Sequence, residues 1–470
     1  MKIVVIGAGI SGLALGYRLT ERAARQGTPL DLTVLEAESR VGGTMGSIET
    51  NDGFIIETGP NGVLDNKPDT LALAQDLGIS NRLVSGSDSA NRRWIVLNGR
   101  LEALPNGPGA FLRSRLLSPW AKLRIAMEMW LPRRSAATDE SVADFARRRL
   151  GPRALERLID PFVSGIFAGD PERLSVRSAF PRLTELEEQY GSLLRASRAL
   201  ARARRALPAP AGTATNGAPS AGPGDKLWSF EGGMRELPMA LEAALGSAVR
   251  TGERVIDLRR AHDGWVVATD TGLRLSGVDA VVLTIPAFAA ARLLAPLSEG
   301  LSKPLEAIEY APVSVVALGF RRQSVIHPLD GFGFLVPSRE KRPILGCLID
   351  SSVYPGRAPD GHVLLRCMVG GSRRPEVALL PDDELVDLAM RELEPHFGFE
   401  GRPVTSAVIR WRNAIPQYTL GHRDRVDQVA EESRAWPGLW VAGNALRGVA
   451  VNDCTREANR LAESLLPERP

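Results

Sequence analysis

The feature that most constrains this chain is a glycine-rich turn between a buried strand and a helix near its first residue. The apolar run Lys2–Ile6 predicts a short parallel strand. The turn that follows reads Gly7-Ala8-Gly9-Ile10-Ser11-Gly12. An amphipathic pattern then predicts a helix from about Leu13 to Arg25, and Leu32–Leu35 predicts a second strand that ends on Glu36. Parts in this order are typical of a dinucleotide-binding unit.

Each part of this unit has a physical role. Gly7 permits the tight turn, Gly9 lets the backbone approach a pyrophosphate, and Gly12 lets helix and strand pack closely. The helix N-terminus offers unpaired N–H groups and a positive dipole to the phosphates. The Glu36 carboxylate accepts hydrogen bonds from ribose hydroxyls and disfavours a 2′-phosphate. A lone glycine turn is weak evidence, so the prediction depends on the complete order of parts.

A second glycine pair favours a flavin over a nicotinamide. The segment Arg40-Val41-Gly42-Gly43 follows Glu36 and resembles the second glycine pair of the amine-oxidase-like flavoprotein superfamily. There the segment approaches the phosphates and ribityl chain of FAD. Thr44 stands where those families usually have arginine, so the resemblance implies FAD with one phosphate contact changed.

Length and composition favour two domains and exclude several kinds of site. A chain of 470 residues exceeds a single ordinary core. Its 58 basic and 55 acidic residues nearly balance, which gives no argument for nucleic acid binding. The cysteines Cys347, Cys367 and Cys454 and the five scattered histidines show no metal-ligand spacing, so we expect buried reduced thiols and no metal. No signal peptide precedes the first strand, and no apolar run reaches the roughly 18–20 residues of a membrane-spanning helix. We expect the protein in the cytoplasm or on the cytoplasmic face of the cell membrane.

The predicted elements indicate an α/β fold in which two domains alternate along the chain. We expect a Rossmann-type FAD-binding domain built from residues 1–88, 226–300 and 416–470, and a mixed-sheet substrate domain at 301–415. A helical region at 89–206 and a flexible linker at 207–225 are inserted between them. Asn98-Gly99 predicts a hairpin within the helical region. Single elements are also predicted: a strand at Val249–Leu258 and a helix at Leu183–Ala206.

The helical region carries an apolar and basic stretch. Leu116–Arg134 mixes Leu, Trp, Ile and Met with several Lys and Arg, the composition of a helix that lies on a membrane surface. Most helices of this kind are core helices with a solvated face, so the composition leaves both readings open.

Several internal motifs resemble the oxygen-dependent protoporphyrinogen oxidases of haem biosynthesis, nearly end to end. They are more specific than the glycine turn, because generic amine oxidases lack them. The matching segments are Gly59-Pro60-Asn61, Arg92-Arg93-Trp94, Ser164–Pro171, Gly331–Pro337, Cys367–Ser372, Ile415–His422 and Gly448–Cys454.

The resemblance implies a set of FAD contacts by position. It assigns them to Gly7, Ala8, Gly9, Ile10, Ser11, Gly12, Glu36, Ala37, Arg40, Gly43, Thr44, Gly59, Pro60, Asn61, Gly62, Val255, Trp411, Gly443, Val449, Ala450 and Val451. The final helix begins in the last of these segments, and its N-terminal dipole suits the electron-rich edge of a reduced flavin.

The resemblance also implies the substrate contacts. Arg93 would hold a propionate of the tetrapyrrole, and Leu335, Leu348 and Met368 would form the apolar walls of its site. Two further residues are implied, Gly169 in the backbone that closes against the substrate and Asn61 beside the flavin. By pattern alone, the two leucines read as plain core and the arginine as a surface cation.

The implied activity is protoporphyrinogen IX oxidation by hydride transfer to flavin N5, with molecular oxygen as the electron acceptor and hydrogen peroxide as a product. No residue is predicted as a general base. Alternatives are coproporphyrinogen III oxidation, another FAD amine-oxidase-like oxidoreductase, and a non-catalytic FAD-binding module. The partners expected are a porphyrinogen and oxygen, peripheral membrane contact, a second copy of the chain and a ferrochelatase, with no nucleic acid.

Overall fold

A parallel five-stranded sheet combines segments from the beginning, the middle and the end of the chain. In this computed structural model, which describes residues 1–133, 138–206 and 226–468, its strand order is β10-β2-β1-β14-β20. The strands are β1 Lys2–Ile6, β2 Asp31–Leu35, β10 Val249–Arg250, β14 Ala280–Leu283 and β20 Leu439–Val441. Strands β1 and β14 are almost wholly buried, as expected of parallel strands covered on both faces. The linker predicted at 207–225 lies outside the described residues.

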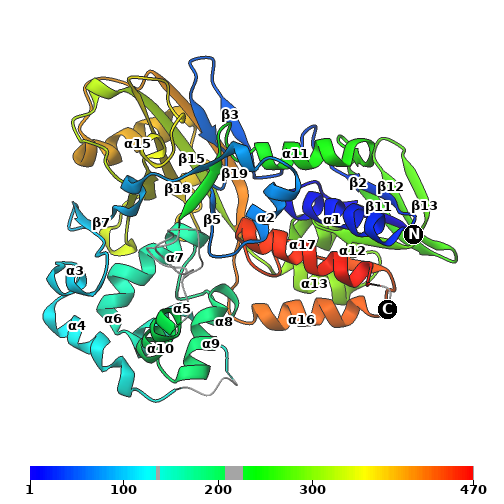
Figure 1. The fold of residues 1–470 in the computed structure, drawn as a ribbon, viewed down its shortest axis with the longest axis horizontal. Coiled ribbons are helices and arrows are strands. Elements are labelled where there is room, and N and C mark those ends of the chain that lie inside the picture. The colour runs from blue at the N-terminus through cyan, green and yellow to red at the C-terminus, as the bar shows by residue number, and fades with distance from the viewer. Residues whose placement is uncertain (134–137, 207–225, 469–470) are drawn as a thin grey trace.

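Helices cover both faces of this sheet (Figure 1). One face packs against α1 Ile10–Gln26, α2 Asp69–Asp76, α11 Glu236–Leu245 and α17 Val451–Leu465. The other packs against α12 Ala287–Leu294, α13 Glu299–Glu306, α16 His422–Ser433 and a small sheet of β11 Val255–Ala261, β12 Gly264–Thr269 and β13 Arg274–Val278. Helices α1 and α17 lie side by side although they stand at opposite ends of the chain.

A second large sheet is mixed and seven-stranded, in the order β19-β15-β18-β17-β16-β7-β8, and lies where the sequence predicts the substrate domain. Its strands are β7 Arg93–Leu97, β8 Arg100–Ala103, β15 Tyr310–Arg321, β16 Gly333–Leu335, β17 Ile344–Leu348, β18 His362–Gly370 and β19 Thr405–Pro416. Helix α15, Asp382–Phe397, packs against one face. The predicted hairpin at Asn98-Gly99 forms, but β7 pairs with β16, so the hairpin belongs to this sheet and not to the helical region.

The helical region lies below this sheet in Figure 1. Its helices are α3 Pro108–Arg113, α4 Pro119–Ala126, α5 Val142–Arg149, α6 Pro152–Ala154, α7 Asp160–Phe167, α8 Val176–Ala179, α9 Pro181–Tyr190 and α10 Leu193–Ala206, with a 3-10 turn at Met127–Trp130 and a π-helical turn at Leu155–Ile159. Among the described residues, no helix has both the length and the apolar character required to span a bilayer.

The single helix predicted at Leu183–Ala206 is wrong. It divides into α9 and α10 at Gly191, which has a left-handed conformation with φ 70°. The buried carboxylate of Glu128 accepts the Ser192 hydroxyl and the N–H groups of Leu193 and Leu194, and so caps the new helix.

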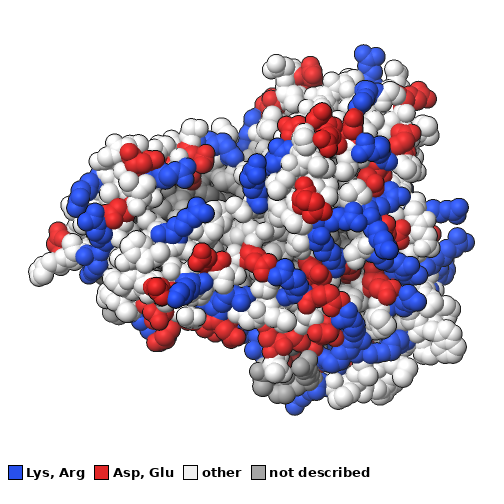
Figure 2. Space-filling view, turned by 180° about the vertical axis from the view of Figure 1, so that it is seen from behind, with Lys and Arg blue, Asp and Glu red and all other residues white. Residues whose placement is uncertain are grey.

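The strand predicted at Val249–Leu258 is also wrong, since β10 joins the parallel sheet and β11 joins another. Two further small sheets complete the fold. They comprise β3 Ser47–Glu49 with β4 Ile55–Glu57, and β5 Val63–Leu64, β9 Leu227–Phe230 and β6 Leu83–Ser85. Figure 2 shows acidic and basic side chains interspersed over the rear face, in line with the net charge of +3.

Candidate functional site

The glycine turn after β1 has the geometry that a pyrophosphate site requires. Gly7 has φ +106°, and its N–H donates to the Leu35 carbonyl at 2.7 Å. A Cβ on Gly12 would lie 1.9 Å from the Gly7 carbonyl oxygen, so only glycine fits there. A Cβ on Gly9, by contrast, would meet no atom of residues 1–133, 138–206 and 226–468 within 4 Å. The backbone at the N-terminus of α1 is therefore open at Gly9, where a phosphate would approach.

The acidic residue predicted to bind ribose lies beside this turn. Glu36 accepts hydrogen bonds from the N–H of Ala8 at 2.8 Å and from the N–H of Glu38 at 3.0 Å. The Glu36 carbonyl also accepts the N–H of Glu253 at 2.7 Å, which brings the segment before Val255 alongside Ala37. These residues therefore lie together although more than 200 positions separate them.

The second glycine pair packs directly on the first. The N–H of Gly42 donates to the Ala8 carbonyl at 2.8 Å, and a Cβ on Gly43 would lie 3.7 Å from the Gly9 Cα. Arg40 donates to the Gly43 carbonyl at 3.0 Å and so braces its own loop. The next residue, Thr44, borders Gly59, where a Cβ would lie 2.2 Å from the Thr44 carbonyl oxygen.

The loop Gly59-Pro60-Asn61-Gly62 presents an unpaired polar group. The amide nitrogen and oxygen of the Asn61 side chain are both buried and have no hydrogen-bond partner in the part of the chain that the structure describes. A Cβ on Gly62 would lie 2.1 Å from the Tyr354 hydroxyl, so the loop backbone packs directly against Tyr354 and only glycine fits there. Trp411 donates its indole N–H to the Thr58 carbonyl at 2.7 Å. The loop is therefore closely packed, and the side-chain amide of Asn61 offers one donor group and one acceptor to a bound molecule.

The C-terminal segment supplies a second helix N-terminus near the first. Gly443 comes shortly after β20, and a Cβ on it would lie 3.6 Å from the Thr284 carbonyl oxygen. Helix α17 begins at Val451, after Val449 and Ala450, and its N-cap residue Ala450 makes no side-chain cap. The open Gly9 backbone, the unpartnered Asn61 amide and the N-terminus of α17 fit FAD: the N-terminus of α1 would hold its diphosphate, and that of α17 would stabilise negative charge on the cofactor. The individual FAD contacts of Ile10, Ser11, Pro60 and the other named residues stay predictions.

Four of the predicted substrate residues share one face of the seven-stranded sheet. One row of paired residues runs from Arg93 through Gly333 to Leu348, and the neighbouring row runs from Leu335 through Gly346 to Met368. Because paired residues point to the same side of a sheet, the four side chains form one surface.

This face is open, unlike the opposite one. Leu335, Leu348 and Met368 are each partly exposed, whereas Cys347 and Cys367 on the other face are fully buried beneath α15. The three free cysteines are all buried, as predicted. The pattern distinguishes an apolar wall from a plain core.

Helix α7 faces this wall. A Cβ on Gly165 would lie 2.9 Å from Leu335, and the neighbouring Phe162 and Ile166 are 41% and 38% exposed. The Arg93 guanidinium lies 4.9 Å from the Phe332 ring centre, which orients the cation at the edge of the sheet face. Apolar side chains therefore border the face from two elements, with a cation at one side.

Gly169 does not join this group. It is buried, and a Cβ there would lie 2.5 Å from the Gln417 side-chain oxygen and 2.9 Å from Leu174. Its neighbour Ala168 accepts the N–H of Ser372 at 2.8 Å, which ties the helical region to the end of β18. Gly169 is thus packed between Gln417 and Leu174 and does not lie on the sheet face.

Sequence reasoning missed a buried arginine on the same row as Leu348. Arg366 of β18 is 2% exposed and forms an ion pair with the fully buried Asp350, at 2.8 Å. Burial raises the pKa of the Asp350 carboxyl, and Arg366 opposes this shift. An arginine inside the apolar run Val363–Val369 was the available signal, since an apolar strand seldom carries a charge without a structural or functional reason.

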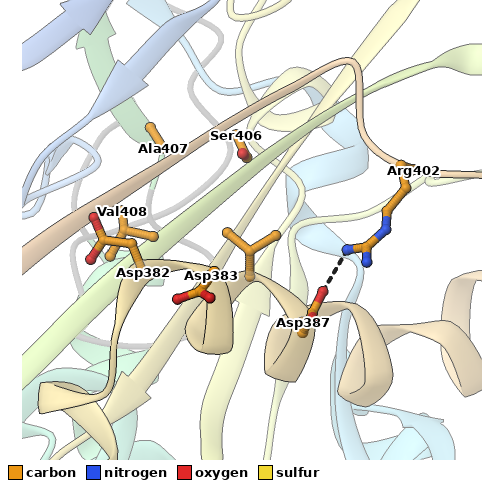
Figure 3. A pocket seen from close by; sticks show the side chains of 8 residues that line it. Asp382, Asp383, Asp387, Arg402, Ser406, Ala407 and Val408 are labelled. Atoms are coloured by element: carbon orange, nitrogen blue, oxygen red, sulfur yellow. Dashed lines mark hydrogen bonds and ion pairs between the residues drawn. The ribbon is translucent and has the colours of Figure 1, made fainter.

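A second hollow lies apart from these residues, between α15 and β19 (Figure 3). It is lined by Asp382, Asp383, Val386, Asp387, Arg402, Ser406, Ala407 and Val408. Asp387 is paired with Arg402 at 2.5 Å and Asp382 with Arg410 at 2.7 Å. Two of its three carboxylates are thus neutralised by arginines, and none of the predicted site residues lines this hollow.

Comparison with known proteins agrees with this geometry. The sequence matches the family described as flavin containing amine oxidoreductase over residues 10–466. A protoporphyrinogen oxidase of Bos taurus is 33% identical and covers 100% of this chain and 99% of its own. A coproporphyrinogen III oxidase of Bacillus subtilis (strain 168) is 30% identical, over 96% of this chain and 95% of its own. The crystal structure of an Exiguobacterium sp. 255-15 protein, described as a protoporphyrinogen oxidase, superposes with a TM-score of 0.82 at 28% identity. The match covers 100% of this chain and 99% of that chain.

These matches confirm the α/β fold, the FAD cofactor and the resemblance to protoporphyrinogen oxidases that the sequence indicated. A non-catalytic module is not favoured, since the relatives are named as oxidases over nearly their whole length. The chain belongs to the family of flavin-containing amine oxidoreductases and is an FAD-dependent oxidase.

Proposed function

We propose that this oxidase converts protoporphyrinogen IX to protoporphyrin IX, with molecular oxygen as the electron acceptor and hydrogen peroxide as the second product. The observation that carries the proposal is the partly exposed apolar sheet face with Arg93 at its edge. A porphyrinogen is a broad apolar macrocycle with carboxylate arms, so it requires such a face and a fixed cation. The relatives named as protoporphyrinogen oxidases give further support.

The side chains of the face have separate roles in this proposal. Leu335, Leu348 and Met368 contact the pyrrole rings and exclude water, and the Met368 thioether adapts to a ring that turns between oxidation steps. Arg93 holds one propionate, so that the macrocycle enters in a fixed orientation. Phe162 and Ile166 of α7 close the opposite side.

The remaining chemistry belongs to the cofactor. When bound, the flavin accepts a hydride at N5 and delivers the electrons to oxygen. The protein's contribution is to hold a meso carbon of the substrate against that position and to keep the site dry. The uncapped N-terminus of α17 would stabilise negative charge on the reduced ring.

Coproporphyrinogen III is the second candidate substrate. The relative from Bacillus subtilis, which aligns over 95% of its own length, carries the name coproporphyrinogen III oxidase. That substrate has additional propionates and would require more cations around the face.

The test compares both porphyrinogens with the purified protein in air. We expect a yellow protein that forms fluorescent protoporphyrin and consumes oxygen, with a higher kcat/KM for protoporphyrinogen IX than for coproporphyrinogen III. The reverse order would establish the second candidate. Oxidation of a primary amine with no oxidation of either porphyrinogen would overturn both and indicate another activity within the family.

We also propose that the helical region attaches the protein to the cytoplasmic face of a membrane. Large apolar side chains protrude from α3, α4 and the following turn, and they are Leu112, Trp120, Leu123, Met127 and Trp130. Trp120 and Trp130 are 79% and 72% exposed, unusual for core helices. In Figure 2 the lower right corner of the molecule combines uncharged surface with Lys and Arg. An exposed apolar surface bordered by cations suits an interface with anionic lipid.

Vesicle flotation tests this attachment. We expect the protein to float with vesicles that contain phosphatidylglycerol, and the double variant Trp120→Ser/Trp130→Ser to remain in the lower fraction. The control is Met239→Ser/Ile326→Ser, which removes two similarly exposed apolar side chains elsewhere. Equal flotation of both variants would show that Trp120 and Trp130 do not contact the membrane, and would overturn the proposed attachment.

A second copy of the chain and a ferrochelatase stay predicted partners, supported by the family resemblance. Light scattering after size-exclusion chromatography tests the first. Co-purification with the ferrochelatase of the same cell tests the second.

A further inference from the structure

We infer that Arg366 is a positioning residue that sets the flavin loop against the wall of the substrate site. The flavin loop is the segment Gly59–Gly62 that carries Asn61. Three successive backbone carbonyls where β4 ends and this loop begins accept hydrogen bonds from the seven-stranded sheet. Arg366 donates to the Glu57 carbonyl at 3.3 Å and to the Gly59 carbonyl at 3.0 Å, and Trp411 donates to the Thr58 carbonyl between them. The loop that carries Asn61 is thus fixed by two side chains of another domain.

The position of Arg366 in its strand gives this contact its significance. On β18 it stands two residues before Met368 and pairs with Leu348 of β17. The same rigid strand therefore presents one wall of the apolar face and holds the loop beside the flavin. A shift of the strand would move both together, so the distance between substrate and flavin is preserved.

Stability alone does not account for a charge at this place. Arg366 and Asp350 are almost completely buried, and an ion pair of this kind stabilises a fold no better than well-packed apolar residues. Neighbouring strand positions such as Leu364 and Leu365 are fully buried and apolar. The guanidinium does what an apolar side chain could not, because it spans two carbonyls that have no other side-chain donor among the bonds of the described residues.

Arg366 is too deeply buried to bind the substrate itself. Its exposed fraction is 2%, whereas Arg93 is at the other end of the same row, at the start of β7, with Gly333 and Leu348 between them. The two arginines therefore have different roles on one sheet face: the outer one contacts a carboxylate of the substrate, and the inner one acts through the flavin loop.

The experiment removes the Arg366 guanidinium in two ways, once with the Asp350 carboxylate kept and once with it replaced as well. Arg366→Lys keeps a cation for Asp350 but loses the planar fork, and Arg366→Met/Asp350→Asn removes the pair so that no lone charge is buried. Arg149→Met/Glu128→Gln is the matched control, because this ion pair in the helical region is also completely buried. For each protein we would measure the FAD dissociation constant, the visible circular dichroism of the bound flavin, the melting temperature, kcat and KM.

We expect both Arg366 variants to change the flavin circular dichroism and to weaken FAD binding about tenfold. We also expect kcat to fall about tenfold or more, since small misplacements of reacting groups are costly, while KM changes less than about threefold. The lysine variant should retain more kcat than the double variant. The control should lose melting temperature with no change in the flavin signal.

An Arg366→Lys protein that differs from the wild type in melting temperature alone would overturn the inference, as would an equal flavin change in the control. The kcat arm rests on the proposed function. If the wild type oxidised neither porphyrinogen but the variants still altered FAD affinity and circular dichroism, the proposed substrate would fail and the role of Arg366 would stand.

Discussion

Replacing two glycines of the same turn separates the binding of FAD from the stability of the fold. Gly9 and Gly12 lie three residues apart, yet their surroundings are opposite. A Cβ at Gly9 meets no atom within 4 Å, whereas one at Gly12 would lie 1.9 Å from the Gly7 carbonyl oxygen and 2.6 Å from the Thr284 hydroxyl. Gly9→Ser and Gly12→Ala are therefore a matched pair of small additions.

The expected free-energy changes follow from these distances. Gly9 is the N-cap of α1 with extended backbone, and serine is a preferred N-cap, so the apoprotein should lose no stability. The added hydroxyl would occupy the phosphate approach and accept the N–H groups that the diphosphate would use, so FAD should bind about tenfold more weakly, or about 1.4 kcal/mol. Gly12→Ala forces backbone apart in a packed turn and should cost the apoprotein about 3 kcal/mol.

Denaturant titrations of the apoproteins and of samples with added FAD measure both effects. At an FAD concentration about a hundredfold above the wild-type Kd, bound FAD adds about 2.7 kcal/mol to stability, and a tenfold weaker Kd reduces this by about 1.3 kcal/mol. The reasoning is refuted if Gly9→Ser binds FAD as tightly as the wild type, or if Gly12→Ala leaves the apoprotein as stable as before.

Three further outcomes are expected. Arg93→Ala should raise KM for the porphyrinogen about tenfold or more with kcat within about threefold, because it removes a charge-assisted bond to a carboxylate; an unchanged KM in steady-state kinetics would exclude Arg93 from the site. Burial lowers the pKa of His422 to about 4, so the unfolded chain binds the extra proton first as the pH falls below about 6.5. Stability should therefore decline from about pH 6.5 to about pH 4, by about 3 kcal/mol from this residue, and urea titrations of His422→Gln should show a flatter decline. Burial also raises the pKa values of the thiols of Cys347, Cys367 and Cys454, so a thiol reagent should label none of them until denaturant is added; rapid labelling of the native protein would contradict the buried positions.

Local signals predicted the first domain well. The strand, turn and helix of residues 2–26 lie within one unit, and Gly7 and Gly12 have steric reasons within or beside the turn, so the local sequence predicts the arrangement. The strands of the substrate domain were also predicted, because runs such as Val313–Phe320 alternate or remain apolar over their whole length.

The elements that were missed depend on partners far away in the chain. Strand β7 pairs with β16 across more than 200 residues, and no feature of the hairpin itself indicates that partner. The end of α9 depends on the Glu128 carboxylate that caps the next helix from 64 residues before Ser192. The sequence does not indicate the role of Arg366, because the carbonyls of Glu57 and Gly59 that accept its hydrogen bonds are more than 300 residues away in the chain.

The parallel sheet also constrains how the protein is synthesised. Strand β20 forms one edge of the sheet beside β14, and α17 packs with α1, α2 and α11 over one of its faces, although β20 and α17 both follow residue 438. During synthesis β14 therefore emerges long before β20, and the edge of β14 that β20 covers stays unpaired over that interval. A chain that stops before residue 439 would lack both β20 and α17, so we expect an aggregation-prone fragment rather than a slower enzyme.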